Sequence, residues 1–235
     1  MRSHSSIPSS ILSGGLFMML PRNRLPETDI YAVLSSSHCR GRGNVETARL
    51  LLEAGVKIIQ YREKDFPSAQ NYSECRAIRD LCRQHEACFI VNDDALLARS
   101  VEADGLHLGQ DDIAPESART IVGGQMLIGL SVSTAPQVDA AVNQTEVDYL
   151  GVGPIFEART TKPDASPPGN LELLDYSLFR SKVPIVAIGG IGLENAGEVA
   201  ARGRVILAMI SGLIGAEDIG QRVLEIRSAI GKAHG

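Results

Sequence analysis

Short apolar segments alternate with amphipathic ones along most of the chain. The apolar segments are rich in β-branched residues, which is typical of strands that are buried on both faces of a parallel sheet. We expect eight strands, at residues 30–34, 57–64, 88–91, 105–108, 126–130, 149–152, 184–188 and 205–210. Each is followed by a stretch with helical spacing, so the pattern predicts an α/β fold.

The number of strand–helix units favours one (β/α)₈ TIM barrel, which would form a single catalytic domain over residues 29–235. A doubly wound open sheet is the structural alternative. That fold usually carries a G-x-G-x-x-G turn after its first strand, and here the turn is missing.

Residues 1–28 lack this periodicity, and we expect a flexible N-terminal extension there. The segment begins with several serines and contains prolines between residues 21 and 26. Residues 11–20 are mildly apolar, but the run is too short to span a bilayer and no small-x-small cleavage site follows it. The sequence therefore predicts no membrane association.

Composition narrows the function classes. The 235 residues are 44% hydrophobic and 22% charged, as in soluble globular proteins. A net charge of −5, only 4% aromatic residues and the absence of Trp argue against a nucleic-acid partner. The four cysteines form no C-x-x-C pair, which argues against a zinc site and favours a reducing, cytoplasmic location.

The strand at residues 57–64 carries the most informative polar pattern. Side chains alternate along a strand, so Gln60, Arg62 and Lys64 share one face, which spans about 13 Å at ~3.3 Å per residue. A diphosphate fits this row, because Arg offers a planar fork and Lys a point charge. The alternative interpretation is a solvated strand end with ordinary surface charges.

Polar residues also follow most of the other predicted strands. The carboxyl ends of barrel strands meet at one mouth, where catalytic groups lie. The residues at these ends are Asn92, Asp93, Asp111, Asp112, Ser131, Gly189, Gly190 and Ser211.

Two of these positions predict a metal site. Asp93 and one of Asp111 and Asp112 would flank the cationic row, and Mg²⁺ is commonly held by one or two carboxylates plus substrate phosphates. The alternative is that these residues only cap the following helices.

Gly189-Gly190 and Ser211, in the last two loops, are typical of a barrel phosphate site, although a tight turn would also need glycine. His107 lies between apolar neighbours within a predicted strand. We interpret it as a core histidine with satisfied hydrogen bonds rather than a catalytic base.

Taken together, these motifs resemble the thiamine-phosphate synthases of the thiamine synthase/TenI barrel superfamily. The resemblance extends from about residue 30 to residue 230. It rests on residues 60–64 (QYREK), 92–93 (ND), 105–112 (GLHLGQDD), 129–131 (GLS), 151–156 (GVGPIF), 187–191 (AIGGI) and 209–211 (MIS).

The resemblance implies a transferase of thiamine biosynthesis that joins hydroxymethylpyrimidine diphosphate to thiazole phosphate, giving thiamine phosphate and diphosphate. It implies a Mg²⁺ cofactor held by Asp93 and Asp112, and catalytic roles for Arg62, Lys64 and Lys162. The substrate-binding residues that it implies are Gln60, Tyr61, Arg62, Glu63, Lys64, Asn92, Ser131, Thr160, Thr161, Lys162, Gly190, Ile210 and Ser211. The partners are then small molecules, and the oligomeric state stays open, a homo-oligomer included.

The loop at residues 156–162 departs from the family pattern Phe-Pro-Thr-x-Thr-Lys, since it reads Phe-Glu-Ala-Arg-Thr-Thr-Lys. With a one-residue insertion, Thr161 and Lys162 regain the Thr-Lys pair; without it, Thr161 takes the lysine position. The Phe-Glu beginning also occurs in TenI-type relatives, so a thiazole tautomerase is the alternative enzyme. A non-catalytic protein that binds thiazole phosphate or thiamine phosphate is the alternative from another class.

Overall fold

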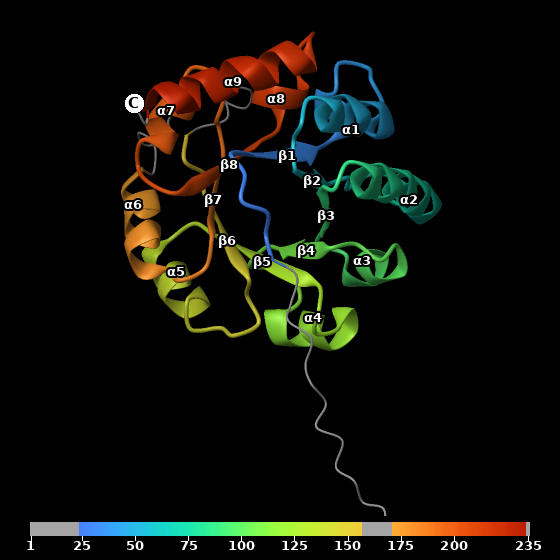
Figure 1. Ribbon diagram of the computed structural model, residues 1–235. Helices are drawn as coiled ribbons and strands as arrows, with labels where there is room; N and C mark the ends of the chain where they lie inside the picture. The colour runs from blue at the N-terminus through green and yellow to red at the C-terminus, as the bar shows by residue number, and fades with distance from the viewer. Residues whose placement is uncertain (1–23, 157–170, 234–235) are drawn as a thin grey trace, which may run out of the picture.

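The structure, a computed structural model, describes residues 24–156 and 171–233 (Figure 1). Eight parallel strands close into a barrel in sequence order, with β8 paired to β1. The strands are β1 (Ile30–Leu34), β2 (Ile58–Tyr61), β3 (Cys88–Asn92), β4 (Gly105–Leu108), β5 (Leu127–Val132), β6 (Tyr149–Val152), β7 (Ile185–Ile188) and β8 (Val205–Met209). The prediction of a (β/α)₈ TIM barrel is confirmed.

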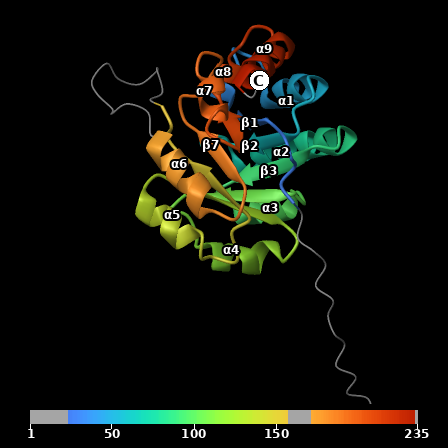
Figure 2. The ribbon, with the colours of Figure 1, turned by 60° about the vertical axis from the view of Figure 1, so that its left-hand side comes forward.

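Helices surround the barrel on its outside (Figures 1 and 2). They are α1 (Asn44–Glu53), α2 (Ser68–Gln84), α3 (Ala95–Ser100), α4 (Pro115–Val122), α5 (Ala135–Ala141), α6 (Leu171–Arg180), α7 (Ala196–Ala200), α8 (Ser211–Ile214) and α9 (Ile219–Ala233). A 3₁₀ turn, Ser36–His38, follows β1. No helix in the described ranges is long and apolar enough to cross a membrane.

β2 is shorter than the sequence pattern predicts. It ends at Tyr61, opposite the last residue of β1, Leu34. The next residue, Arg62, still donates its backbone N–H to the Leu34 carbonyl oxygen at 3.1 Å. Beyond this point β1 offers no further partner, so Lys64 lies in the loop after the strand, at the mouth of the barrel.

Alternation along the strands divides the apolar residues into two clusters. Outward-facing residues pack against the helices and form the larger cluster. Inward-facing residues fill the barrel and form the smaller one, which contains Leu25, Tyr31, Val33, Ile58, Cys88, Ile90, Leu127, Tyr149, Val186, Ile206 and Ala208.

All four cysteines are buried and free, and burial raises the pKa of each thiol.

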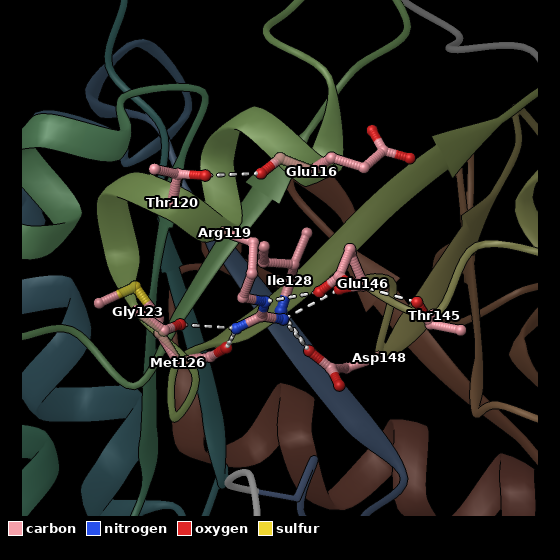
Figure 3. Close-up of polar contacts among 9 residues, drawn as sticks. All are labelled: Glu116, Arg119, Thr120, Gly123, Met126, Ile128, Thr145, Glu146 and Asp148. Atoms are coloured by element: carbon pink, nitrogen blue, oxygen red, sulfur yellow. Dashed lines mark hydrogen bonds and ion pairs between the residues drawn. The ribbon is translucent and has the colours of Figure 1, made fainter. Parts of the chain in front are cut away.

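One arginine, Arg119, connects α4 to the segments that precede β5 and β6 (Figure 3). Arg119 of α4 donates to the backbone oxygens of Gly123, Met126 and Glu146, and it contacts the Asp148 carboxylate at 2.9 Å. Asp148 in turn accepts the backbone N–H of Ile128 at 2.8 Å. The arginine thus satisfies backbone groups where both strands begin, which is a structural role.

The segment before β1 crosses the end of the barrel (Figure 1). Leu25, within the last part of the predicted extension, is only 8% exposed and joins the inner cluster. Residues 1–23 lie outside the described part, so the boundary at residue 28 and the flexibility of the extension stay predictions.

Leu25→Ala is expected to lower the free energy of unfolding by about 2 kcal/mol, the lower end for a buried leucine, because the site borders a hollow. For a chain of this size the melting temperature should fall by roughly 4–8 °C. Deleting residues 1–18, which lack core periodicity, should leave it nearly unchanged. Thermal unfolding of both variants checks this, and equal losses would contradict it.

Candidate active site

A cavity of about 270 Å³ opens inside the barrel toward the carboxyl ends of the strands. Side chains from seven strands and the residues after them surround it, and polar groups are concentrated on the side of β2 to β5. The lining residues are Tyr31, Val33, Gln60, Arg62, Asn92, His107, Ser131, Gly151, Val186, Ile188, Ala208 and Ile210. Of the residues predicted from separate strand ends, Gln60, Arg62, Asn92, Ser131 and Ile210 are therefore brought together in this cavity.

β2 places the cationic row at this cavity. Gln60 and Arg62 line it, and Gln60 is buried. Lys64 lies farther out with its side chain 59% exposed, and its Nζ is 3.7 Å from Asp93 Oδ2. A row that begins inside the cavity and ends in solvent suits a substrate with a ring at one end and a charged group at the other.

Tyr61 and Glu63 point away from this cavity, as strand alternation requires. Tyr61 Oη lies 2.9 Å from Asn71 Oδ1 and 3.0 Å from Glu74 Oε2, both on α2. The Glu63 carboxylate accepts from Asn44 Nδ2 at 2.9 Å. Both residues border a second hollow, of about 340 Å³, which also contains Lys64 and Asp93. Their predicted contact with substrate is not tested by this placement and stays a prediction.

The Asp93 and Asp112 carboxyl groups lie together beside the row. Asp112 Oδ2 accepts the Gly109 backbone N–H at 2.7 Å. Burial, followed by a hydrogen bond to the Asp112 carboxylate and the charge of Asp112, raises the pKa of Asp93 to about 6, against the opposing charges of Lys64 and Arg62. The charge of Asp112 thus disfavours the ionisation of Asp93, and a bound divalent cation would oppose this effect.

Asp93 does not cap the helix that follows it, so the helix-capping alternative is wrong for this residue. The residue after it, Asp94, caps α3, since its Oδ1 accepts the Leu97 backbone N–H at 2.8 Å. Asp93 itself has φ 63°, an uncommon value for a non-glycine residue, and its carboxylate contacts Lys64.

Oxygen donors of this kind fit Mg²⁺, which completes its shell with water and substrate oxygens. Groups of three or more His, Cys, Asp or Glu side chains that could hold a metal are absent from the described ranges. The pair would therefore depend on a substrate for further ligands.

The loops after β7 and β8 pack against each other on the far side of the cavity. A Cβ on Gly212 would lie 2.6 Å from the Ile191 carbonyl oxygen, so the close approach requires glycine. Asn195 braces the first loop, donating to the Gly190 carbonyl oxygen and accepting the Gly192 backbone N–H. Gly190 thus lies in one of two packed loops and Ile210 and Ser211 lie in the other, and these are the loops where barrels commonly bind phosphate.

His107 is a satisfied interior histidine, as its apolar neighbours indicated. Its Nδ1 is 2.9 Å from Tyr149 Oη and its Nε2 is 2.9 Å from Ser131 Oγ. Burial lowers the pKa of His107 to about 4, although the charge of Asp112 acts in the opposite direction, so the ring is neutral at pH 7.

Two tyrosines of the site were not predicted. Tyr31 and Tyr149 lie inside the barrel, and Tyr31 lines the cavity. In the sequence both stand in apolar strands, and only the direction in which each strand faces distinguishes them from packing residues.

Three predicted site residues, Thr160, Thr161 and Lys162, lie outside the described residues together with Arg159. The roles given to them stay predictions.

A larger hollow, of about 1040 Å³, lies at the opposite end of the barrel. It is bordered by residues 24–28 and by the beginnings of several strands, including Leu127, Ile185 and Val205. It contains none of the predicted site residues, and catalytic groups of barrels belong to the other end.

The barrel, its cavity at the carboxyl ends, the carboxylate pair and the two packed loops define the class of (β/α)₈ barrels suited to phosphorylated ligands. A family model described as thiamine monophosphate synthase matches residues 30–213. The chain belongs to this family.

Individual relatives agree with this assignment. The chain is 45% identical over 208 residues to a thiamine-phosphate synthase of Pelotomaculum thermopropionicum, a match covering 88% of this chain and 94% of the relative. It is 38% identical to the enzyme of the same name from Lawsonia intracellularis, covering 92% and 98%.

Among solved structures, a thiamine phosphate pyrophosphorylase from Pyrococcus furiosus superposes with a TM-score of 0.78 at 34% identity, covering 88% of this chain and 97% of that one. A tryptophan synthase alpha chain from Legionella pneumophila, at 15% identity and a TM-score of 0.58, shares the fold alone.

Proposed function

We propose that this protein is a thiamine-phosphate synthase, a transferase that joins 4-amino-2-methyl-5-(diphosphooxymethyl)pyrimidine to thiazole phosphate. The observation that carries the proposal is the meeting of Arg62 and Lys64 with the Asp93–Asp112 pair at the mouth of a cavity large enough for a small ring. The names of the relatives agree with it.

The reaction breaks the C–O bond between the pyrimidine methylene carbon and the diphosphate, which leaves with the bonding electron pair. The thiazole nitrogen lone pair forms the new C–N bond, and the nitrogen becomes positively charged. The aminopyrimidine ring stabilises positive charge on the methylene carbon. No proton moves, so a general base is not required, and this agrees with a neutral, fully hydrogen-bonded His107.

The chain's own residues would bind and orient the two substrates. Gln60, Asn92 and Ser131 would hold the pyrimidine, while Arg62 and Lys64 would meet the diphosphate charge as it develops. Gly190, Ile210 and Ser211 would bind the thiazole phosphate across the cavity. Asp93 and Asp112 would hold Mg²⁺, which when bound neutralises charge on the leaving diphosphate.

Two alternatives remain to be separated by experiment. A TenI-type tautomerase would need the thiazole side of the cavity only, and a non-catalytic protein that binds thiazole phosphate or thiamine phosphate would need no groups for a leaving diphosphate. Neither explains a carboxylate pair beside a cationic row on the opposite side.

We also propose a cytoplasmic location, because the four cysteines are free. A homo-oligomer is compatible with this proposal.

The direct test mixes the purified protein with both substrates, with and without Mg²⁺, and measures thiamine phosphate and diphosphate. Stoichiometric formation of both products only with Mg²⁺ supports the proposal. Isomerisation of a thiazole carboxylate phosphate without condensation would support the tautomerase, and binding without turnover would support the non-catalytic protein.

Lys162→Ala is expected to lower kcat on the order of 100-fold, because the resemblance gives this lysine the leaving diphosphate and such charge stabilisation is typically worth ~3 kcal/mol. Lys162→Arg should restore only part of the rate. Arg159→Ala is the matched comparison at saturating Mg²⁺. A near-normal Lys162→Ala beside a severe loss in Arg159→Ala would transfer the role to Arg159.

A further inference from the structure

Five side chains from five strands form one continuous hydrogen-bonded chain across the interior of the barrel. Gln60 Nε2 donates to Tyr31 Oη at 2.7 Å, and Tyr31 Oη lies 3.0 Å from Tyr149 Oη. Tyr149 then meets His107, and His107 meets Ser131, each at 2.9 Å. The two ends of the chain, Gln60 and Ser131, are the side chains proposed to hold the pyrimidine.

The neighbouring strands leave room for the rings of this chain. Gly129 of β5 is in register with His107 on one side and Tyr149 on the other. A Cβ on Gly129 would lie 2.1 Å from Tyr149 Cζ, a distance that no structure tolerates. A Cβ on Gly151 would lie 2.9 Å from His107 Cε1. The missing side chains therefore allow Tyr149 and His107 to meet above β5.

One direction of donation uses every hydrogen of this hydrogen-bonded chain. Each tyrosine hydroxyl and the neutral imidazole has a single hydrogen to donate. Since Gln60 donates to Tyr31, every hydrogen finds an acceptor within the chain when Tyr31 donates to Tyr149 and Tyr149 donates to His107 Nδ1. His107 then carries its hydrogen on Nε2 and donates it to Ser131 Oγ, which leaves the serine hydrogen for a ligand.

We propose that Tyr31, Tyr149 and His107 are positioning residues that fix the hydrogen-bond polarity of Gln60 and Ser131 and thereby select an aminopyrimidine ring. The inference rests on the proposed function and adds three residues to it. The three act through their neighbours: the order of hydrogens that they maintain presents the Gln60 amide oxygen as an acceptor and the Ser131 hydroxyl as a donor.

This polarity complements a ring that carries one hydrogen-bond donor and one acceptor. An exocyclic amino group donates to the amide oxygen, and an unprotonated ring nitrogen accepts from the serine hydroxyl. A ring with a carbonyl oxygen in place of the amino group would set two acceptors against each other, and sites of this kind reject such mismatches strongly. The neutral chain also avoids a net charge next to the ring.

The kinetic test interrupts the chain at its centre. Tyr149→Phe keeps the ring and removes the hydroxyl, so the KM for the pyrimidine diphosphate should rise on the order of 10- to 100-fold. The KM for thiazole phosphate should stay within about twofold, since no member of the chain lies in the loops after β7 and β8. Tyr176→Phe, which removes a hydroxyl bonded to Asp139 outside the barrel, is the matched control.

The double variant Tyr31→Phe/Tyr149→Phe tests whether the two tyrosines act as parts of one hydrogen-bonded chain or as two independent contacts. Residues that act as one unit give a double variant little worse than the worse single variant. A product of the two single effects, or a rise of both KM values together, would overturn the proposal and leave a packing role. If Tyr149→Phe fails to fold, as judged by circular dichroism, Tyr31→Phe supplies the same kinetic comparison.

A second measurement needs no substrate. With ¹⁵N-labelled histidine, assigned by comparison with His107→Asn, the free protein at pH 7 should show Nδ1 unprotonated and Nε2 protonated. The opposite tautomer would overturn the proposed direction even if the enzyme condenses its substrates. Conversely, the predicted tautomer in a wild-type protein without condensation activity would retain the chain and reject only the pyrimidine as its ligand.

Discussion

Asp93→Asn is expected to lower kcat about 1,000-fold, a loss of several kcal/mol of transition-state stabilisation. The change keeps the size of the side chain and removes one of the two charges proposed to hold Mg²⁺. Because burial and the charge of Asp112 disfavour the ionisation of Asp93, removing the Asp93 charge without metal should leave the melting temperature equal or higher. A parallel loss of activity and stability would indicate a structural role instead.

Asp111→Asn is the matched comparison for this prediction. Asp111 neighbours Asp112 and is exposed, whereas Asp112 accepts from the Gly109 backbone and faces Asp93. Asp111→Asn should therefore keep kcat within about threefold, as surface substitutions usually do. EDTA should abolish condensation by the wild type, and excess Mg²⁺ should restore it. Full activity in metal-free buffer would reject the metal site.

The strand pattern was sufficient to predict the barrel because each apolar segment is short, buried on both faces and followed by a helix. It also predicted which residues at the end of β2 and just after it face the cavity: with a period of two, Gln60 and Arg62 share a face, and both line the cavity. The same rule turns Tyr61 and Glu63 the other way, where the structure gives them partners on the outer side of β2.

The interior chain could not be predicted in the same manner. In a strand such as β1, all residues beside the tyrosine are apolar. The local pattern is then the same whether the tyrosine faces the helices or the barrel interior. The contact of Tyr149 with His107 depends on the register that places Gly129 between them. Register is a property of two paired strands, so it cannot be predicted from a single sequence when the pairing of the strands is not known.

The end of β2 shows a related limit. Its polar residues continue the alternation, so the pattern predicts a strand through Lys64, while the observed strand ends where β1 ends. This difference has a functional consequence, because Lys64 is then free of the sheet and reaches Asp93 from a loop.

Arg62→Ala is expected to lower kcat/KM for the pyrimidine diphosphate by roughly 150- to 900-fold, since a guanidinium that meets developing charge in a sheltered site contributes about 3–4 kcal/mol. The backbone should stay in place, because the Arg62 N–H bond to the Leu34 carbonyl oxygen does not depend on the side chain.

Arg62→Lys tests how the side chain acts. If the planar fork binds two diphosphate oxygens at once, the lysine should recover no more than about tenfold of the loss, because an ammonium group offers only a point charge. Arg76→Ala, on the exposed face of α2, controls for the loss of one positive charge from the protein as a whole. Steady-state kinetics with each substrate varied in turn locate the effect. Full recovery by lysine would show that charge alone matters at this position, and an equal loss in Arg76→Ala would show that net charge, rather than contact in the cavity, governs the rate.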